Sequence, residues 1–102
     1  MAPPLYFLNI YIYMKLEACV DSVKSARNAY EGGASRVEVC GNLIEGGTTP
    51  SIGLVKQVLH AVGSLLKVHV LIRPRGQDFL YEEDEIEMMM HDISYMKEIG
   101  VQ

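Results

Sequence analysis

The order of apolar and polar residues predicts a chain in which short strands alternate with helices from Met14 onward. Short apolar runs predict three strands, at residues 15–20, 36–40 and 65–72. After each run, apolar residues recur at helical spacing, which predicts helices over residues 22–31, 52–62 and 82–99. Asp21 or Ser22 is a suitable N-cap for the first helix and Ser51 for the second, and glycines follow all three helices.

Strands that alternate with helices in this way indicate βαβ units and a parallel sheet with right-handed crossovers. The third strand is apolar and β-branched, and Pro74 ends it soon after its last residue. The fold class expected is therefore α/β. Three βα units cannot close a barrel and leave strand edges unpaired, so we expect this chain to be part of something longer.

The last predicted helix carries an apolar stripe that is expected to pack in the core. Its members lie at helical spacing and are Ile86, Met89, Met90, Ile93 and Met96. Thioethers can bind copper, but this spacing favours packing. His69, in the middle of a strand, is expected to be a core histidine, whereas His60 and His91 are expected on the surface.

Residues 1–13 are interpreted as an apolar extension whose role is unclear, and residues 14–102 as the domain proper. The extension is rich in tyrosine, lacks a basic start or a small-residue cleavage site, and is cut short by Lys15 and Glu17. It therefore resembles neither a signal peptide nor a membrane span of about 20 residues. An extra edge strand or a degenerate anchor is the alternative interpretation.

Composition excludes several classes of function. The formal net charge of −4 argues against nucleic acid as a partner, because phosphate binding requires a basic surface. Two cysteines do not make a secreted disulfide framework. The chain has no glycine loop of the Walker or dinucleotide type, so no nucleotide site is expected.

Two short segments repeat each other, Glu17-Ala18-Cys19 and Glu38-Val39-Cys40, and they contain both cysteines. Residues two apart share a face of a strand, so each glutamate lies on the face of its own cysteine. On adjacent parallel strands, two thiols would form a rim with two carboxylates one layer deeper. Two thiolates suit Cu(I), whereas zinc would need further ligands. Burial as small apolar residues and a disulfide are the alternatives.

The two glutamates need partners, because a carboxylate that faces an interior is costly unless it is paired. Arg73 and Arg75, which follow the third strand, are the expected partners. One interpretation is a buried layer of ion pairs. The other is a site for a small anionic ligand held by arginine, with Glu17 or Glu38 as general acid or base. The loop at 45–51 offers backbone amides for an anion before a helix.

Several of these segments together resemble the CutC copper homeostasis family. The matching segments are residues 17–22 (EACVDS), 36–40 (RVEVC), 45–51 (EGGTTPS), 72–76 (IRPRG) and 78–81 (DFLY). They occur in the family's order and spacing from about Met14 to the end of the chain. At Gln77 the family usually carries a second glycine.

The resemblance implies a TIM barrel, (β/α)8, of which this chain holds about the first three βα units. It implies a protein generally described as cytoplasmic, and sometimes also as nuclear, that handles copper and self-associates when complete. In this family, Cu(I) binding is attributed to cysteines at the ends of the first two strands, and the corresponding residues here are Cys19 and Cys40. The competing hypotheses are a TIM-barrel enzyme acting on a small anion, with Glu17, Glu38 and the two arginines, and a non-functional truncated product.

Overall fold

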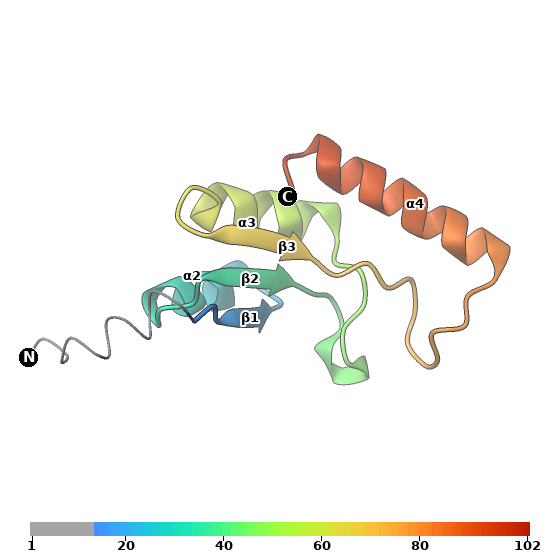
Figure 1. Cartoon of the computed structure of the whole chain (residues 1–102), viewed down its shortest axis with the longest axis horizontal. Coiled ribbons are helices and arrows are strands. Elements are labelled where there is room, and N and C mark those ends of the chain that lie inside the picture. Colours follow the sequence, from blue (N-terminus) through green and yellow to red (C-terminus); the bar gives the residue numbers. More distant parts are fainter. Residues whose placement is uncertain (1–13) are drawn as a thin grey trace, which may run out of the picture.

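The computed structural model describes residues 14–102, so the interpretation of residues 1–13 lies outside the described part of the chain. Strands and helices alternate along it, as the sequence predicts (Figure 1). The elements are β1 (Glu17–Val20), α2 (Val23–Glu31), β2 (Arg36–Val39), the 3-10 turn η1 (Leu43–Glu45), α3 (Ile52–Val62), β3 (Lys67–Val70) and α4 (Glu83–Glu98).

The three strands form one parallel sheet in the order β1-β2-β3. Helices α2 and α3 pack on one face of this sheet and against each other, and no helix within residues 14–102 covers the opposite face (Figure 1). The core lies between the sheet and these two helices. Its buried residues are Val20, Ala26, Val37, Val39, Val55, Val58, Val62, Val68 and Met96.

Both predicted N-caps are confirmed. The hydroxyl of Ser22 accepts a hydrogen bond from the backbone N–H of Ser25, and that of Ser51 accepts one from Leu54, at 3.0 and 3.1 Å. Each bond satisfies a donor that the first turn of a helix cannot satisfy internally. These local bonds fix where α2 and α3 begin, and therefore how the loops after β1 and β2 end.

The apolar stripe of α4 is not packed in the core, so that prediction is wrong for most of its members. Ile86, Met90 and Ile93 are 48%, 62% and 45% exposed, and Met96 is the buried residue of this helix. The reason is that α4 packs against the core only near its C-terminal end, at Met96, and otherwise projects beyond the sheet (Figure 1). The spacing of the apolar residues correctly predicted an apolar face on α4, but nothing within residues 14–102 covers that face.

The third strand is also shorter than predicted, Lys67–Val70 instead of residues 65–72. Its ladder to β2 covers four residues, because β2 itself ends at Val39. Among the described residues, no helix has the length and apolar content needed to cross a membrane.

A cysteine-carboxylate cluster as the candidate functional site

The face of the sheet that carries no helix is lined by polar side chains in layers. Parallel pairing sets residues of the three strands side by side, and alternate residues along each strand share this face. The lower layer consists of Glu17, Arg36 and Lys67, and the next consists of Cys19, Glu38 and His69. Cys40, directly after β2, continues the same face. Charged and nucleophilic groups therefore gather on one side of the sheet while valines fill the other.

The repeated Glu-x-Cys segments are offset by two residues relative to the predicted arrangement. Cys19 lies beside Glu38, and Glu17 lies beside Arg36, so the two carboxylates do not share a layer. Val20 pairs with Val39 in the same register, and both are buried. Packing of the apolar face against α2 and α3 fixes which side chains of each strand face the helices, because a one-residue slip would turn the apolar residues outward. The polar side chains therefore face away from the helices.

This offset places the carboxylate of Glu38 between the two thiols. Oε1 of Glu38 accepts hydrogen bonds from Sγ of Cys19 and Sγ of Cys40, each at 3.6 Å. Among the described residues, these three side chains form the group with three metal-ligating atoms close together, all within 4.8 Å of one another. The structure thus brings the two predicted ligands, Cys19 and Cys40, into one cluster.

Both thiols hold their protons more tightly than a free cysteine does. Burial, followed by the charge of Glu38, raises the pKa of Cys40 from 9.0 to about 12. The same two causes raise the pKa of Cys19, which is exposed to solvent. The metal-free cluster is therefore a pair of neutral thiols donating to one carboxylate at neutral pH.

Glu17 of the lower layer forms an ion pair with Arg36 and also contacts His69 of the next layer. Its Oε2 lies 2.8 Å from Nε of Arg36 and 3.3 Å from Nδ1 of His69. The side chain of His69 is 38% exposed, so the prediction of a core histidine is wrong. His69 lies on the open face of the sheet, the face that no described helix covers, because it is in register with Glu38, whose side chain lies on that face.

The prediction that Arg73 and Arg75 pair with Glu17 and Glu38 is also wrong. The guanidinium of Arg73 donates to the backbone oxygens of Glu45, Gly47 and Gln77. That of Arg75 instead contacts the carboxylates of Asp78 and Glu85.

Both arginines lie beyond the end of β3, where the chain turns into loops, and nearer polar groups in those loops bind them first. An anion clamp built from Glu17, Glu38 and these two arginines is therefore not formed within residues 14–102.

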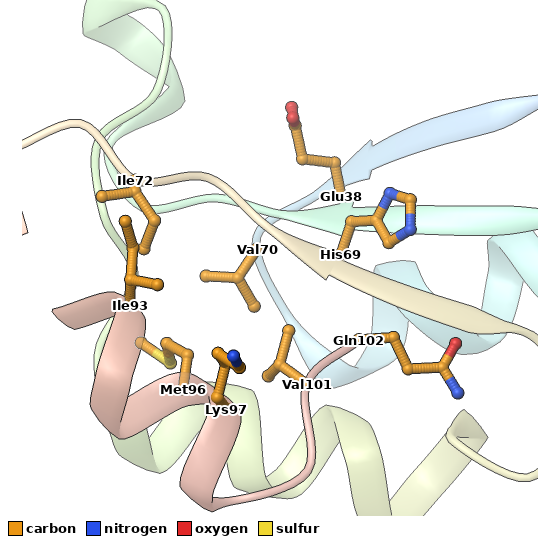
Figure 2. A pocket seen from close by; sticks show the side chains of 9 residues that line it. All are labelled: Glu38, His69, Val70, Ile72, Ile93, Met96, Lys97, Val101 and Gln102. Carbon is orange, nitrogen blue, oxygen red and sulfur yellow. The ribbon is translucent and has the colours of Figure 1, made fainter. Parts of the chain in front are cut away.

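Beside the cluster, a half-open cleft of about 330 Å³ separates β3 from α4. Figure 2 shows Glu38 and His69 at one side of it, with Val70 and Ile72 of the β3 segment facing Ile93 and Met96 of α4. Lys97 adds a positive charge to the helix side. Glu38 therefore belongs both to the thiol cluster and to the wall of an apolar cleft.

Comparison with known proteins bears on the family. The model of the CutC family matches residues 14–102. This chain belongs to the CutC family. It is 53% identical over 85 residues to a copper homeostasis protein cutC homolog of Mus musculus, covering 83% of this chain and 30% of the relative. The Homo sapiens homolog is 54% identical over the same length and covers the same shares.

The crystal structure of CutC from Streptococcus agalactiae resembles the fold described above, with a TM-score of 0.78 and 37% sequence identity. The match covers 86% of this chain and 43% of that structure. The chain spans about 30% of the length of the mouse and human CutC homologs. The predicted α/β fold, a part of the family's barrel, is confirmed.

Within this CutC segment, sequence reasoning missed Arg36 as the partner of Glu17. A signal was present, because Arg36 is two residues before Glu38 and so shares its face of the strand. Glu38 was a candidate acid or base, and the structure adds that it bridges the two thiols.

Proposed function

We propose that this chain binds Cu(I) through the thiolates of Cys19 and Cys40 and so takes part in copper homeostasis. The observation that carries the proposal is the Cys19-Glu38-Cys40 cluster, whose ligating atoms lie within 4.8 Å of one another. The names of the mouse and human relatives, copper homeostasis proteins, support the same chemistry.

The spacing of the cluster suits one soft ion held by two sulfurs. With the zinc–thiolate bond of about 2.3 Å as a guide, two sulfurs on opposite sides of an ion are about 4.6 Å apart. The ligating atoms of the cluster all lie within 4.8 Å of one another, so the two sulfurs are close enough to reach one ion together. Thiolates favour Cu(I), while structural zinc needs four ligands, and the cluster supplies two sulfurs and one oxygen.

Glu38 has a different role from the cysteines. A carboxylate is a hard ligand and a poor one for Cu(I), but its Oε1 already accepts a hydrogen bond from each thiol. It is suited to pass to solvent, one at a time, the protons that both thiols must lose before they bind a metal ion. This exchange requires free thiols, and both cysteines are free. We therefore assign the function to a reducing compartment, the cytoplasm.

The test is anaerobic titration of the purified chain with Cu(I) in competition with a chromogenic chelator. The wild-type chain is expected to bind one Cu(I), and the Cys19→Ala, Cys40→Ala double variant none. Met90→Leu is the matched control, because Met90 is an exposed soft donor on α4, away from the cluster. Its binding is expected to equal that of the wild type.

Equal binding by the double variant and the wild type would refute the proposal. Loss of binding in Met90→Leu instead would assign copper to the thioethers of α4. Far-UV circular dichroism of each variant shows whether a loss of binding comes with a loss of fold.

A further inference from the structure

The two thiols of the cluster differ sharply in their access to solvent. Cys19 is exposed, whereas Cys40 is 2% exposed, although both lie on the open face of the sheet. No helix in the described part of the chain covers this face, so the burial of Cys40 needs another cause. The nearest candidate is the loop after β2, residues 41–50.

Gly47 of this loop lies directly against Cys40. A Cβ atom added to Gly47 would be 3.6 Å from Cβ and 3.8 Å from Sγ of Cys40, and 2.8 Å from Cδ2 of Leu71. Gly47 also has a φ of +96°, which a residue with a side chain rarely adopts. Bare backbone at this position therefore allows the loop to close over the thiol.

Arg73 holds the loop in this place. Its Nη1 donates to the carbonyl oxygens of Glu45 and Gly47, both at 2.8 Å, and its Nη2 to that of Gln77 at 2.9 Å. The backbone N–H of Arg73 donates to Oγ1 of Thr49 at 2.8 Å. One side chain thus joins the loop after β2 to the loop after β3.

The cost of burying this side chain indicates that the contact matters. Arg73 is 9% exposed, and within residues 14–102 its charge is met by carbonyl oxygens and the ring of Phe79, not by a carboxylate. A buried cation without a counter-charge is unfavourable unless its donors are satisfied, and here both Nη groups have acceptors whereas the buried Nε has none among the described residues. The planar guanidinium provides several donors at fixed angles, which a lysine cannot do.

We infer that Arg73 is a positioning residue that clamps the backbone of Gly47 over the thiol of Cys40, so that of the two thiols only that of Cys19 is open to solvent. The copper part of this inference rests on the proposed function: Cu(I) would enter and leave past Cys19. The difference in solvent access between the two thiols is a property of the metal-free chain and does not depend on copper.

The experiment measures alkylation of the metal-free full chain by N-ethylmaleimide, with the two cysteine peptides quantified separately by mass spectrometry. In the wild type, Cys19 is expected to react at least tenfold faster than Cys40. In Arg73→Ala the rate at Cys40 is expected to rise at least tenfold. Arg75→Ala is the matched control, because it removes a neighbouring arginine that contacts Asp78 and Glu85 instead of the Gly47 loop.

Two further variants separate clamping from a general loss of stability. Arg73→Lys keeps the charge but cannot reach three carbonyl groups, so Cys40 is expected to react faster than in the wild type. Val58→Ala weakens the core and leaves the clamp intact, so its Cys40 is expected to stay slow wherever the chain remains folded. If Arg73→Ala loses its far-UV circular dichroism, Arg73→Lys decides the question.

A folded Arg73→Ala or Arg73→Lys with Cys40 as slow as in the wild type would overturn the inference. An equal rise at Cys40 in Arg75→Ala would do the same. Alkylation as expected in a chain that binds no Cu(I) would refute the proposed function but leave the clamp intact. Cu(I) binding with equal rates at the two wild-type thiols would refute only the clamp.

Discussion

The pH dependence of Cu(I) affinity follows directly from the protonation of the cluster. Burial and the charge of Glu38 raise the pKa of Cys40 to about 12 and raise that of Cys19 above its ordinary value of 9.0. Between pH 6 and pH 8, both thiols therefore keep their protons in the metal-free chain. Binding as two thiolates has to displace both protons, so the affinity falls as the pH falls.

The size of the effect can be worked out from proton counting. Two displaced protons raise the apparent association constant about 100-fold per pH unit, hence about 10⁴-fold from pH 6 to pH 8. This change corresponds to about 5.5 kcal/mol. Cys40→Ser retains one thiol, so its affinity is expected to be weaker and to rise only about tenfold per unit.

The assay is competition with a Cu(I) chelator whose own protonation has been corrected for, at half-unit steps under anaerobic reducing conditions. A slope of one in the wild type would mean that one thiol alone loses its proton. A slope of zero would refute the thiolate pair altogether. Either result contradicts a site built from both cysteines.

Three further predictions concern the stability of the metal-free chain, each measured by urea denaturation. Folded Cys40 keeps a proton that the unfolded chain releases above its pKa of 9.0, so the contribution of Cys40 to stability is constant below pH 9 and falls as the pH rises from 9 toward about 12, by at most about 1.4 kcal/mol per unit. Cys40→Ala removes this contribution, and an identical pH dependence of the two chains would contradict it. Val58→Ala, at a fully buried site, is expected to lower the free energy of unfolding by about 2 to 3 kcal/mol. Ile93→Ala, at an exposed residue of α4, is expected to lower it by less than about 1 kcal/mol. Similar losses in the two variants would show that this face of α4 is packed. Ser51→Ala is expected to lower the free energy of unfolding by about 1 kcal/mol, because the hydrogen bond from the N–H of Leu54 is lost. Ser51→Asp is expected to retain most of the stability that the cap provides. An unchanged denaturation midpoint in Ser51→Ala would contradict the cap.

The elements of the fold were predictable because their signals are local. Ser22 and Ser51 are each a few residues from the N–H groups that they cap, and the valines of α3 recur at helical spacing. The alternation of strands and helices then restricts the sheet to parallel pairing, which the structure has. The two cysteines were likewise placed at one edge of one face.

What could not be predicted depends on contacts between distant segments. The pairing that sets Cys19 beside Glu38 is a matter of register between β1 and β2, and the repeated Glu-x-Cys segments do not specify that register. Periodicity shows that α4 has an apolar side but not whether a neighbour covers it. The partners of Arg73 are backbone oxygens of two loops. Because every residue has a backbone oxygen, the sequence does not show which of them an arginine binds.

The claim that Cys19 and Cys40 together hold Cu(I) is tested most directly by X-ray absorption at the copper edge of the chain loaded with one equivalent of Cu(I). From the cluster geometry we expect two sulfur neighbours per copper in the wild type. We expect both to be absent in the Cys19→Ser, Cys40→Ser double variant. Oxygen or nitrogen neighbours alone in the wild type, or an unchanged spectrum in the double variant, would contradict the account.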